Sequence, residues 1–198
     1  MKKLEKDFYF RNNVVLIARE LLGKIIFTNS GNKITAGVIT ETEAYAGITD
    51  RASHAFNGRF TERTKIMYEE GGTAYVYLCY GMHHLFNIVT NIRGVPDAVL
   101  IRAIRPYKGL PDLLKRRGLA RAGRDSFIGP GKVSQALGIS VLQSGTSLMG
   151  EQIWLEDAGS NIRDEDIICG PRIGVDYAGE DALRPYRFRY SAAVSAGT

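Results

Sequence analysis

A short stretch near residue 41 gathers side chains that could do acid–base chemistry. Its sequence, ETEAYAGITDRASH, contains two glutamates and a tyrosine at alternate positions and ends at His54. Alternate side chains of a strand share a face, and the residues predicted on one face are Ile39, Glu41, Glu43 and Tyr45. A carboxylate beside an aromatic ring, partly removed from water, has a raised pKa and can act as a general base on water. The alternative is the solvated face of an edge strand.

An arginine inside an apolar run suggests a partner for these carboxylates. Arg102 lies within AVLIRAI, where strand alternation places it beside Leu100 and Ile104. A buried guanidinium is costly without an anion, so we expect a carboxylate to approach it, with Glu41 and Glu43 as the candidates. An arginine and a glutamate that converge on one pocket could hold and orient a water molecule.

The segment YVYLCYGMHH predicts a hairpin rich in tyrosine. Tyr75 and Tyr77 share one strand face, whereas Tyr80 and Met82 stand where the chain must turn. Aromatic side chains in strands usually belong to the core, and that reading suits Tyr75 best. A large apolar side chain at a hairpin end can instead wedge between stacked bases and fill the space of a displaced nucleotide.

The histidines do not have the spacing of a metal site. His83 and His84 are adjacent and point to opposite faces of a strand, so His54 could join only one of them. No HxxxH, HxH or DxD pattern occurs, and we predict no metal and no cofactor. For His54 a structural role and a hydrogen-bonding role beside the carboxylates both remain open.

Positive charge is concentrated in one part of the chain. The net charge is +5, and the segment from Arg102 to Lys132 contains nine Lys or Arg against two Asp. Within it, GPGK (129–132) could present backbone N–H groups to a phosphate, although it lacks the P-loop spacing. Either a solvated helix face or a surface that grips a phosphate backbone would explain this excess. The candidate phosphate contacts are Lys115, Arg116, Arg117, Arg121, Arg124 and Lys132.

Composition places these residues in one globular domain. The chain has 198 residues, of which 44% are apolar and 24% charged. This length and composition allow a hydrophobic core that needs no disulfide or metal to hold it. Cys79 and Cys169 are far apart, which disfavours a disulfide framework or a thiolate zinc site. No apolar run approaches the roughly 18 residues of a membrane span, and no secretory h-region follows the first lysines. We therefore expect a soluble cytoplasmic or nuclear protein.

Local patterns predict an α+β fold. Asn12 or Asn13 can cap a helix with apolar positions from Val14 to Leu21, which Gly23 would end. The other elements expected are strands at KIIFT, 34–45, TAYVYLCY, 84–91 and 99–105, and helices at 61–70, after Pro111 and after GPGK. We predict a single domain over residues 1–198, with a mainly antiparallel curved sheet, surrounding helices and a protruding β-hairpin.

Several motifs occur in the order typical of one enzyme family. They are ETEAY with a histidine nine residues after its tyrosine, GTAYVYLCYGM with an asparagine five residues after its methionine, LIRA, GPGK with QAL, and PRIGVDYAGE. Together they resemble the alkyladenine (3-methyladenine) DNA glycosylases, which include the mammalian enzyme and its bacterial relatives, and the resemblance extends from about Phe8 to Arg189. The residues after Met82 depart from the mammalian pattern, which leaves the range of lesions open.

This resemblance implies a monofunctional DNA glycosylase that initiates base excision repair. It would flip an alkylated or deaminated purine out of double-stranded DNA and hydrolyse the N-glycosidic bond, without a metal or a lysine Schiff base. The purines implied are 3-methyladenine, 7-methylguanine, hypoxanthine and ethenoadenine. Because a hairpin that must enter a groove disfavours burying that face in a dimer, we expect a monomer, in the cytoplasm of a bacterium in association with the nucleoid, or in a eukaryotic nucleus.

The resemblance also implies roles for individual residues. Glu43 would activate water, which Arg102 and the backbone carbonyl of Ile173 would help to hold, and Tyr45 and Tyr77 would sandwich the flipped base. The further roles implied are hydrogen bonding by His54, exclusion of guanine-type amino groups by Asn87, and wedging into the minor groove by Tyr80 with support from Met82. A DNA substrate also agrees with the phosphate contacts that the local basic excess suggests for Lys115, Arg116, Arg117 and Lys132. A non-catalytic module that binds damaged DNA is the main alternative, and a metal-dependent nucleotide hydrolase is another.

Overall fold

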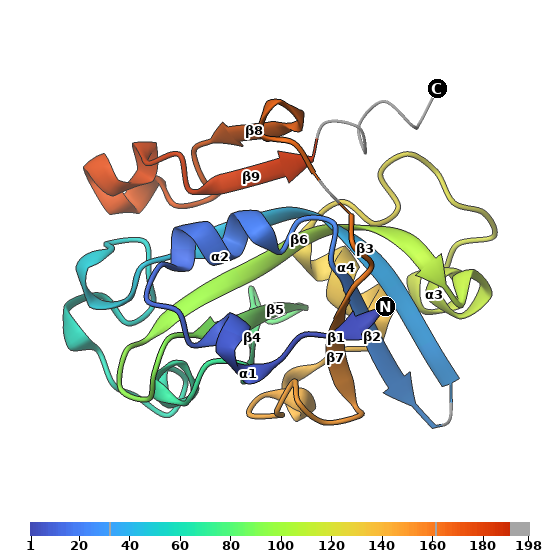
Figure 1. The fold of residues 1–198 in the computed structure, drawn as a ribbon, viewed down its shortest axis with the longest axis horizontal. Helices are drawn as coiled ribbons and strands as arrows, with labels where there is room; N and C mark the ends of the chain where they lie inside the picture. The colour runs from blue at the N-terminus through green and yellow to red at the C-terminus, as the bar shows by residue number, and fades with distance from the viewer. Residues whose placement is uncertain (32, 161, 191–198) are drawn as a thin grey trace.

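A nine-stranded antiparallel sheet organises the chain in the computed structural model, which describes residues 1–31, 33–160 and 162–190 (Figure 1). Its strands are β1 (Lys2–Lys3), β2 (Ile25–Ser30), β3 (Lys33–Tyr45), β4 (Ala74–Cys79), β5 (His83–Thr90), β6 (Asp97–Lys108), β7 (Ile153–Asp157), β8 (Ile167–Gly170) and β9 (Arg187–Tyr190). The order is β1-β7-β2-β3-β6-β5-β4, and the β8–β9 hairpin joins through β9 to β3. The expected α+β class with an antiparallel sheet is confirmed.

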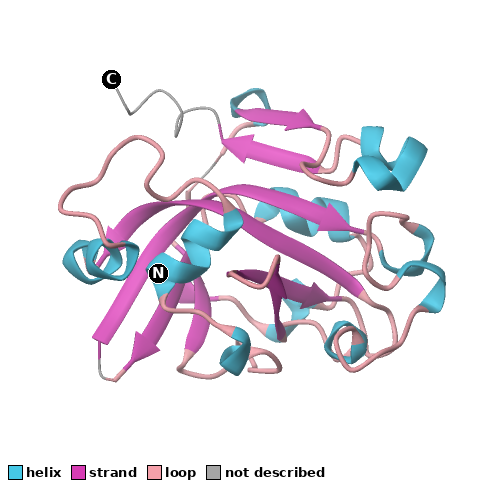
Figure 2. Cartoon of the chain, turned by 180° about the vertical axis from the view of Figure 1, so that it is seen from behind, coloured by secondary structure: helices cyan, strands magenta, loops and turns pink. Residues whose placement is uncertain are grey.

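Short helices surround this sheet (Figure 2). The α-helices are α1 (Lys6–Tyr9), α2 (Val14–Glu20), α3 (Leu110–Arg117) and α4 (Pro130–Leu137), and the 3-10 helices are η1 (Gly47–Thr49), η2 (Phe56–Gly58), η3 (Lys65–Tyr68), η4 (Val141–Gln143), η5 (Asp164–Asp166) and η6 (Asp176–Leu183). The predicted start of α2 is confirmed, because the Asn13 side chain accepts a hydrogen bond from the Leu16 N–H at 2.9 Å. None of the helices in the described residues is long and apolar enough to cross a lipid bilayer.

The helix expected over residues 61–70 is wrong in extent. Only the 3-10 helix η3 forms there. The Thr64 hydroxyl accepts from the Thr61 N–H at 2.8 Å and donates to the Arg59 carbonyl at 3.0 Å. Such side-chain hydrogen bonds to nearby backbone compete with α-helix formation, so the segment folds as turns.

Register shifts between β3 and β6 change which face some residues take. One lies at Ala36–Gly37, and the two nearest the glutamates lie around Thr40 on β3 and Arg102 on β6. An extra residue at a bulge reverses the side-chain alternation that follows it. Ile39 therefore packs in the same core cluster as Ala44, and the expectation that it shares a face with the glutamates is wrong. Ile104 likewise enters that core and does not accompany Arg102.

The glutamate segment of β3 lies in the interior of the sheet. Glu41, Thr42 and Glu43 pair with β9 along one side of β3 and follow the β6 register on the other, and Figure 1 shows β9 alongside the long central strands. Glu41 is 7% exposed and Glu43 is 0% exposed. These carboxylates are thus not the solvated face of an edge strand, and burial gives each a strong requirement for partners.

Candidate active site

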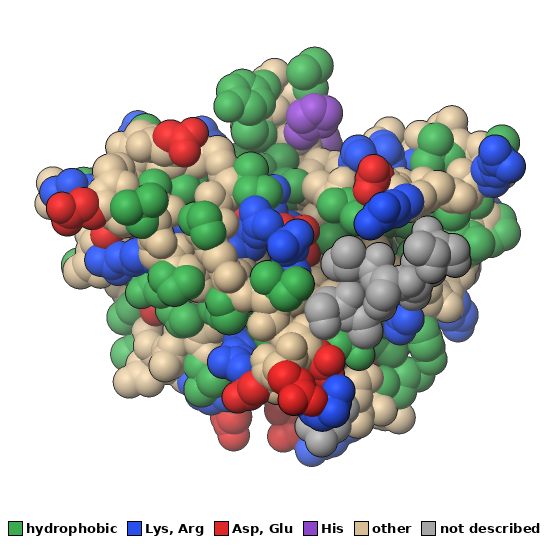
Figure 3. All heavy atoms as spheres, turned by 90° about the horizontal axis from the view of Figure 1, so that it is seen from above, with side chains coloured by type: hydrophobic (Ala, Val, Ile, Leu, Met, Phe, Trp, Pro, Cys, Tyr) green, Lys and Arg blue, Asp and Glu red, His purple; other side chains and the backbone are tan. Residues whose placement is uncertain are grey.

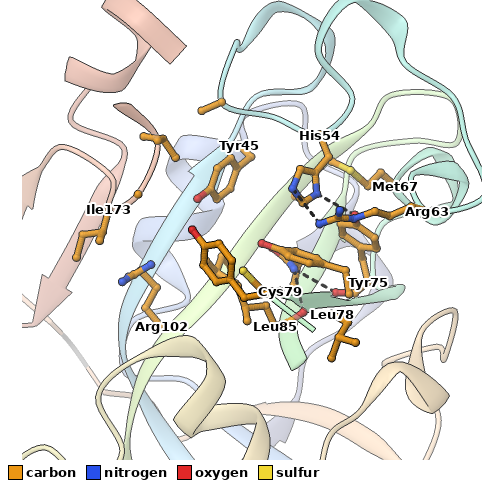
Figure 4. A pocket seen from close by; sticks show the side chains of 18 of the residues that line it. Tyr45, His54, Arg63, Met67, Tyr75, Leu78, Cys79, Leu85, Arg102 and Ile173 are labelled. Carbon is orange, nitrogen blue, oxygen red and sulfur yellow. Dashed lines mark hydrogen bonds between the residues drawn. The ribbon is translucent and has the colours of Figure 1, made fainter. Parts of the chain in front are cut away.

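A cavity of about 390 Å³ lies between the end of β3, the β4–β5 hairpin and the loop around Ile173 (Figure 4). Its volume is in the range of small-molecule pockets, roughly 300–1,000 Å³. The structure brings together most of the residues expected at the site. Those that line the cavity are Tyr45, His54, Tyr77, Asn87, Arg102 and Ile173, with Tyr80 at its margin.

Glu43 lies behind this lining and is fully buried. Its Oε2 accepts hydrogen bonds from the Tyr45 hydroxyl at 2.8 Å and from Arg102 Nη1 at 3.3 Å, and its Oε1 accepts from the Ile173 N–H at 2.8 Å. Burial raises the pKa of Glu43 above its usual value, and the three donors oppose that rise. The arrangement holds a carboxyl group whose proton affinity is increased, which suits a general base.

Arg102 contacts both candidate glutamates. Its side chain is 11% exposed, with Nε 3.4 Å from Glu41 Oε1 and Nη1 3.3 Å from Glu43 Oε2. Glu41 Oε1 also lies 3.3 Å from Arg187 Nε. Both candidate glutamates are therefore anionic partners of Arg102. Glu41 is neutralised by Arg187 as well as by Arg102. These alternating charges reduce the cost of burying Glu43 as a carboxylate.

Ile173 approaches Glu43 through its amide N–H, whereas the role implied from the sequence concerned its carbonyl oxygen. The preceding residue anchors this loop. Arg172 is completely buried and pairs with Asp50 through both terminal nitrogens, with Nη2 2.8 Å from Asp50 Oδ1. Its guanidinium carbon also lies 4.9 Å from the centre of the Tyr45 ring, within cation–π range.

Sequence reasoning missed Arg172 and Asp50. Arg172 in PRIGV, like Arg102, is an isolated arginine among apolar residues and would need a buried anion, which is the signal that could have identified it. Nothing local identifies Asp50 as its partner, because the two residues are 122 positions apart. Arg63, which also lines the cavity, was missed because it lies in a segment read as a helix.

His54 is held by hydrogen bonds on both ring nitrogens. Nδ1 lies 2.9 Å from the Tyr75 hydroxyl and Nε2 lies 3.4 Å from Arg63 Nη2, as Figure 4 shows. The ring meets that of Tyr77 edge-on at 4.6 Å between centroids. Burial, followed by the nearby charges of Arg63 and Arg59, lowers the pKa of His54 to about 4. His54 is therefore neutral at physiological pH.

Asn87 forms part of the cavity wall and is 4% exposed. Its Nδ2 donates to the carbonyl oxygens of Tyr75 and Leu85 at 3.2 and 3.3 Å. With both donors directed at the backbone of the hairpin, its side chain has a fixed orientation. This rigidity suits a residue that limits what enters the cavity.

The tip of the β4–β5 hairpin is exposed and conformationally unusual. Tyr80 and Met82 are 89% and 71% exposed, and hydrophobic side chains project beside a histidine in the space-filling view (Figure 3). Tyr80 has a φ of 51° and Gly81 a φ of 71°. A left-handed backbone costs a non-glycine residue about 1–3 kcal/mol. An aromatic side chain that is both strained and solvated adds little to stability, and such outliers concentrate at functional sites.

The basic candidates divide into two groups. Arg116 donates to Thr35 Oγ1 at 2.9 Å and to the Ala136 carbonyl at 3.0 Å, and Arg117 donates to Ser126 O and to Gln135. Both arginines therefore tie α3 to α4 and their neighbours. Lys115 and Lys132 are exposed, as are Arg121 and Arg124.

The GPGK turn adjoins the hairpin and the strand that carries Arg102. A Cβ placed on Gly131 would come within 3.1 Å of the His83 side chain, so the start of α4 lies against the hairpin. The Gly129 N–H donates to the Arg102 carbonyl at 2.8 Å. Lys132, in the first turn of α4, thus follows directly after the residue that meets the hairpin.

Comparisons with known proteins identify the family of this chain. Residues 7–193 match the family model described as methylpurine-DNA glycosylase (MPG). Relatives named "Putative 3-methyladenine DNA glycosylase" include one from Chlamydia felis at 44% identity, covering 93% of this chain and 94% of the relative, and one from Clostridium novyi at 41%, covering 96% and 94%. Another, from Bacillus cytotoxicus, is 39% identical and covers 92% and 93%. The chain therefore belongs to the methylpurine-DNA glycosylase family and is a DNA N-glycosylase, a hydrolase that acts on the bond between a base and its sugar.

Proposed function

We propose that this chain excises damaged purines from double-stranded DNA, with 3-methyladenine as the type substrate, and that Glu43 is its general base. The observation that carries this proposal is the fully buried Glu43 carboxyl group, held by Tyr45, Arg102 and Ile173 directly behind a cavity lined by aromatic rings. A buried carboxyl group with a raised pKa is matched to proton abstraction from water.

The hydrogen bonds to Glu43 indicate where a water molecule would bind. Each carboxylate oxygen has two acceptor positions. Oε2 accepts from Tyr45 and Arg102, whereas Oε1 accepts from the Ile173 N–H alone among the hydrogen bonds of the described residues. Oε1 can therefore accept one more proton donor. Arg102 and Ile173 both line the cavity, so a water between them would reach Oε1 from the side of the substrate.

A water molecule beside the Glu43 carboxylate could act as the nucleophile in base release. The water oxygen would attack C1′ of the sugar, its proton would pass to Glu43, and the electron pair of the N-glycosidic bond would leave with the base. No lysine occurs among the cavity-lining residues of the described chain, which supports a monofunctional hydrolysis over a Schiff-base mechanism.

The base would bind between aromatic side chains. Tyr45 and Tyr77 line the cavity from different strands, and electron-rich rings attract a cationic methylpurine by about 0.5–2 kcal/mol per favourable contact. The fixed amide of Asn87 would exclude bases that carry a guanine-type amino group. Hypoxanthine and ethenoadenine are neutral, so they would need additional stabilisation as leaving groups.

DNA would reach the site through the exposed hairpin. Tyr80 would enter the minor groove and occupy the space of the flipped nucleotide, supported by Met82, while Lys115 and Lys132 contact phosphates. The strained, solvated conformation of Tyr80 supports this role. A hairpin that must enter a groove also favours action as a monomer, since a dimer that covered the tip would block it.

The proposal is tested with duplex DNA that contains 3-methyladenine, 7-methylguanine or hypoxanthine. The wild-type chain should release free base, detected by chromatography, and leave an abasic site on an uncut strand in the presence of EDTA. Lesion-dependent binding without release of any base would instead establish the non-catalytic damage-binding alternative. Release that EDTA abolishes would indicate a metal-dependent hydrolase.

A further inference from the structure

Arg63 places a positive charge in the cavity beside the aromatic side chains assigned to the flipped base (Figure 4). Its guanidinium carbon lies 4.7 Å from the centre of the Tyr77 ring, and its Nη2 lies 3.4 Å from His54 Nε2. Arg63 therefore contacts two residues of the proposed base-binding pocket. The catalytic roles described above do not use it.

The charge of Arg63 is not offset by its neighbour in the chain. Glu62 pairs with Lys65 at 2.6 Å. Among the cavity-lining residues of the described chain, the charged ones are Arg63 and Arg102, and Arg102 lies between Glu41 and Glu43. Arg63 thus supplies the positive potential at the end of the cavity formed by His54 and Tyr77.

Arg63 also determines the tautomer of His54. A guanidinium can only donate hydrogen bonds, so His54 Nε2 must accept, and the ring proton of a neutral imidazole is on Nδ1. Nδ1 then donates to the Tyr75 hydroxyl oxygen 2.9 Å away. In this state His54 has no proton on Nε2 to give to a leaving base. Because the guanidinium itself does not lose its proton in proteins, this part of the cavity offers a fixed charge and not a general acid.

We propose that Arg63 is a specificity-determining residue whose fixed positive charge favours neutral purine lesions over cationic ones. This inference rests on the proposed function. As the N-glycosidic bond breaks, an electron pair moves onto the base, so a neutral purine becomes anionic and a cationic methylpurine becomes neutral. A nearby cation stabilises the first transition state and has little effect on the second.

The predicted effect differs between kinetic constants. The ratio kcat/KM compares the transition state with free enzyme and free substrate, so Arg63 should raise kcat/KM for a neutral lesion and leave it nearly unchanged for a cationic one. For the cationic lesion, Arg63 repels the bound base before bond cleavage, and most of this repulsion is lost in the transition state as positive charge moves from the base to the sugar. It should therefore raise both KM and kcat for that substrate.

The test compares Arg63→Gln and Arg63→Lys with the wild type on hypoxanthine and on a cationic lesion, 3-methyladenine or 7-methylguanine, in the same duplex. Arg59→Gln is the matched control, because Arg59 is exposed in the same loop and does not line the cavity. Arg63→Gln should lower kcat/KM for hypoxanthine about tenfold, which is the size expected of a partly screened charge a few ångströms away. The same variant should change kcat/KM for the cationic lesion less than twofold.

Restoration of most of the lost hypoxanthine activity by Arg63→Lys, with little effect of Arg59→Gln, would support an electrostatic role. An equal fall on both lesions would overturn the inference and identify Arg63 as a general DNA contact. A wild type that releases the methylated purines but no hypoxanthine would overturn it as well. A wild type that releases no base at all contradicts the proposed function itself, so the two failures are distinguishable.

Discussion

The Tyr45 hydroxyl donates a 2.8 Å hydrogen bond to Oε2 of Glu43, two residues earlier on β3. The two side chains share a face because the pairing of β3 with β6 is regular from Thr42 to Tyr45. The Tyr45 ring also contacts the buried Arg172, whose guanidinium carbon lies 4.9 Å from the ring centre. The proposed base-stacking ring and the proposed general base are therefore one hydrogen-bonded unit.

Tyr45→Phe should move the acidic limb of the pH–rate profile to higher pH. The raised pKa of Glu43 is due first to burial, and the Tyr45 hydrogen bond opposes it. Loss of the hydroxyl raises that pKa further, so the fraction of ionised Glu43 falls at any pH near it. Single-turnover kcat/KM should drop at low pH and approach the wild-type value at high pH, because the ring remains. A uniform loss at every pH would contradict this coupling.

Glu43→Gln should abolish excision while preserving DNA binding. General-base catalysis contributes about 10²–10⁴-fold, and glutamine cannot accept the proton of water. Base release is measured in single turnover and affinity by fluorescence anisotropy with a lesion-containing duplex. Glu62→Gln, which changes a carboxylate that is 91% exposed, is the control and should stay active. An active Glu43→Gln variant would remove Glu43 from the mechanism.

His54 should make stability depend on pH. Its pKa is about 4 in the folded chain against about 6.5 when unfolded, so the unfolded chain binds more protons between these values. Its contribution is fully present above pH of about 6.5 and is lost as pH falls toward 4, by roughly 3 kcal/mol at most. Urea unfolding of His54→Gln should show a shallower slope across this window. A slope that the substitution leaves unchanged would show that His54 makes no such contribution.

Tyr80→Asn should stabilise the fold and impair excision. Asparagine tolerates the left-handed backbone found at this position, where φ is 51°, so part of the strain of about 1–3 kcal/mol is relieved. The variant lacks the ring proposed to replace the flipped nucleotide. Thermal denaturation and single-turnover excision measure the two effects. A variant that is stabilised yet fully active would show that the ring is dispensable.

Lys115→Ala and Arg116→Ala should have opposite signatures, although the residues are adjacent on α3. Lys115 is exposed, so its loss should weaken DNA binding and reduce the salt slope by about one unit while stability is unchanged. Arg116 joins Thr35 and the end of α4, so its loss should lower the free energy of unfolding by about 1–3 kcal/mol. Equal effects on binding would make both residues phosphate contacts.

Local chemistry explains which features could be predicted from the sequence. The start of α2 follows from the capping side chain of Asn13, and the β4–β5 hairpin follows from two strand patterns on either side of Gly81. The common face of Glu43 and Tyr45, and the need of Arg102 for an anion, follow from strand periodicity and the cost of burying charge. Each depends on residues close in the chain or on one elementary energy term.

Tertiary structure decided the rest, since those features depend on how distant segments align. The bulges between β3 and β6 moved Ile39 and Ile104 into the core, and no local pattern records them. The Ile173 N–H meets Glu43 across 130 positions, and the Arg172–Asp50 pair that supports this contact is equally remote. The structure also shows that Lys115 is exposed whereas its neighbour Arg116 is bonded to Thr35 and α4. The sequence alone determined the chemical groups of this glycosylase, and the register of the sheet decided which of them meet, because hydrogen bonds and ion pairs form only at contact distance.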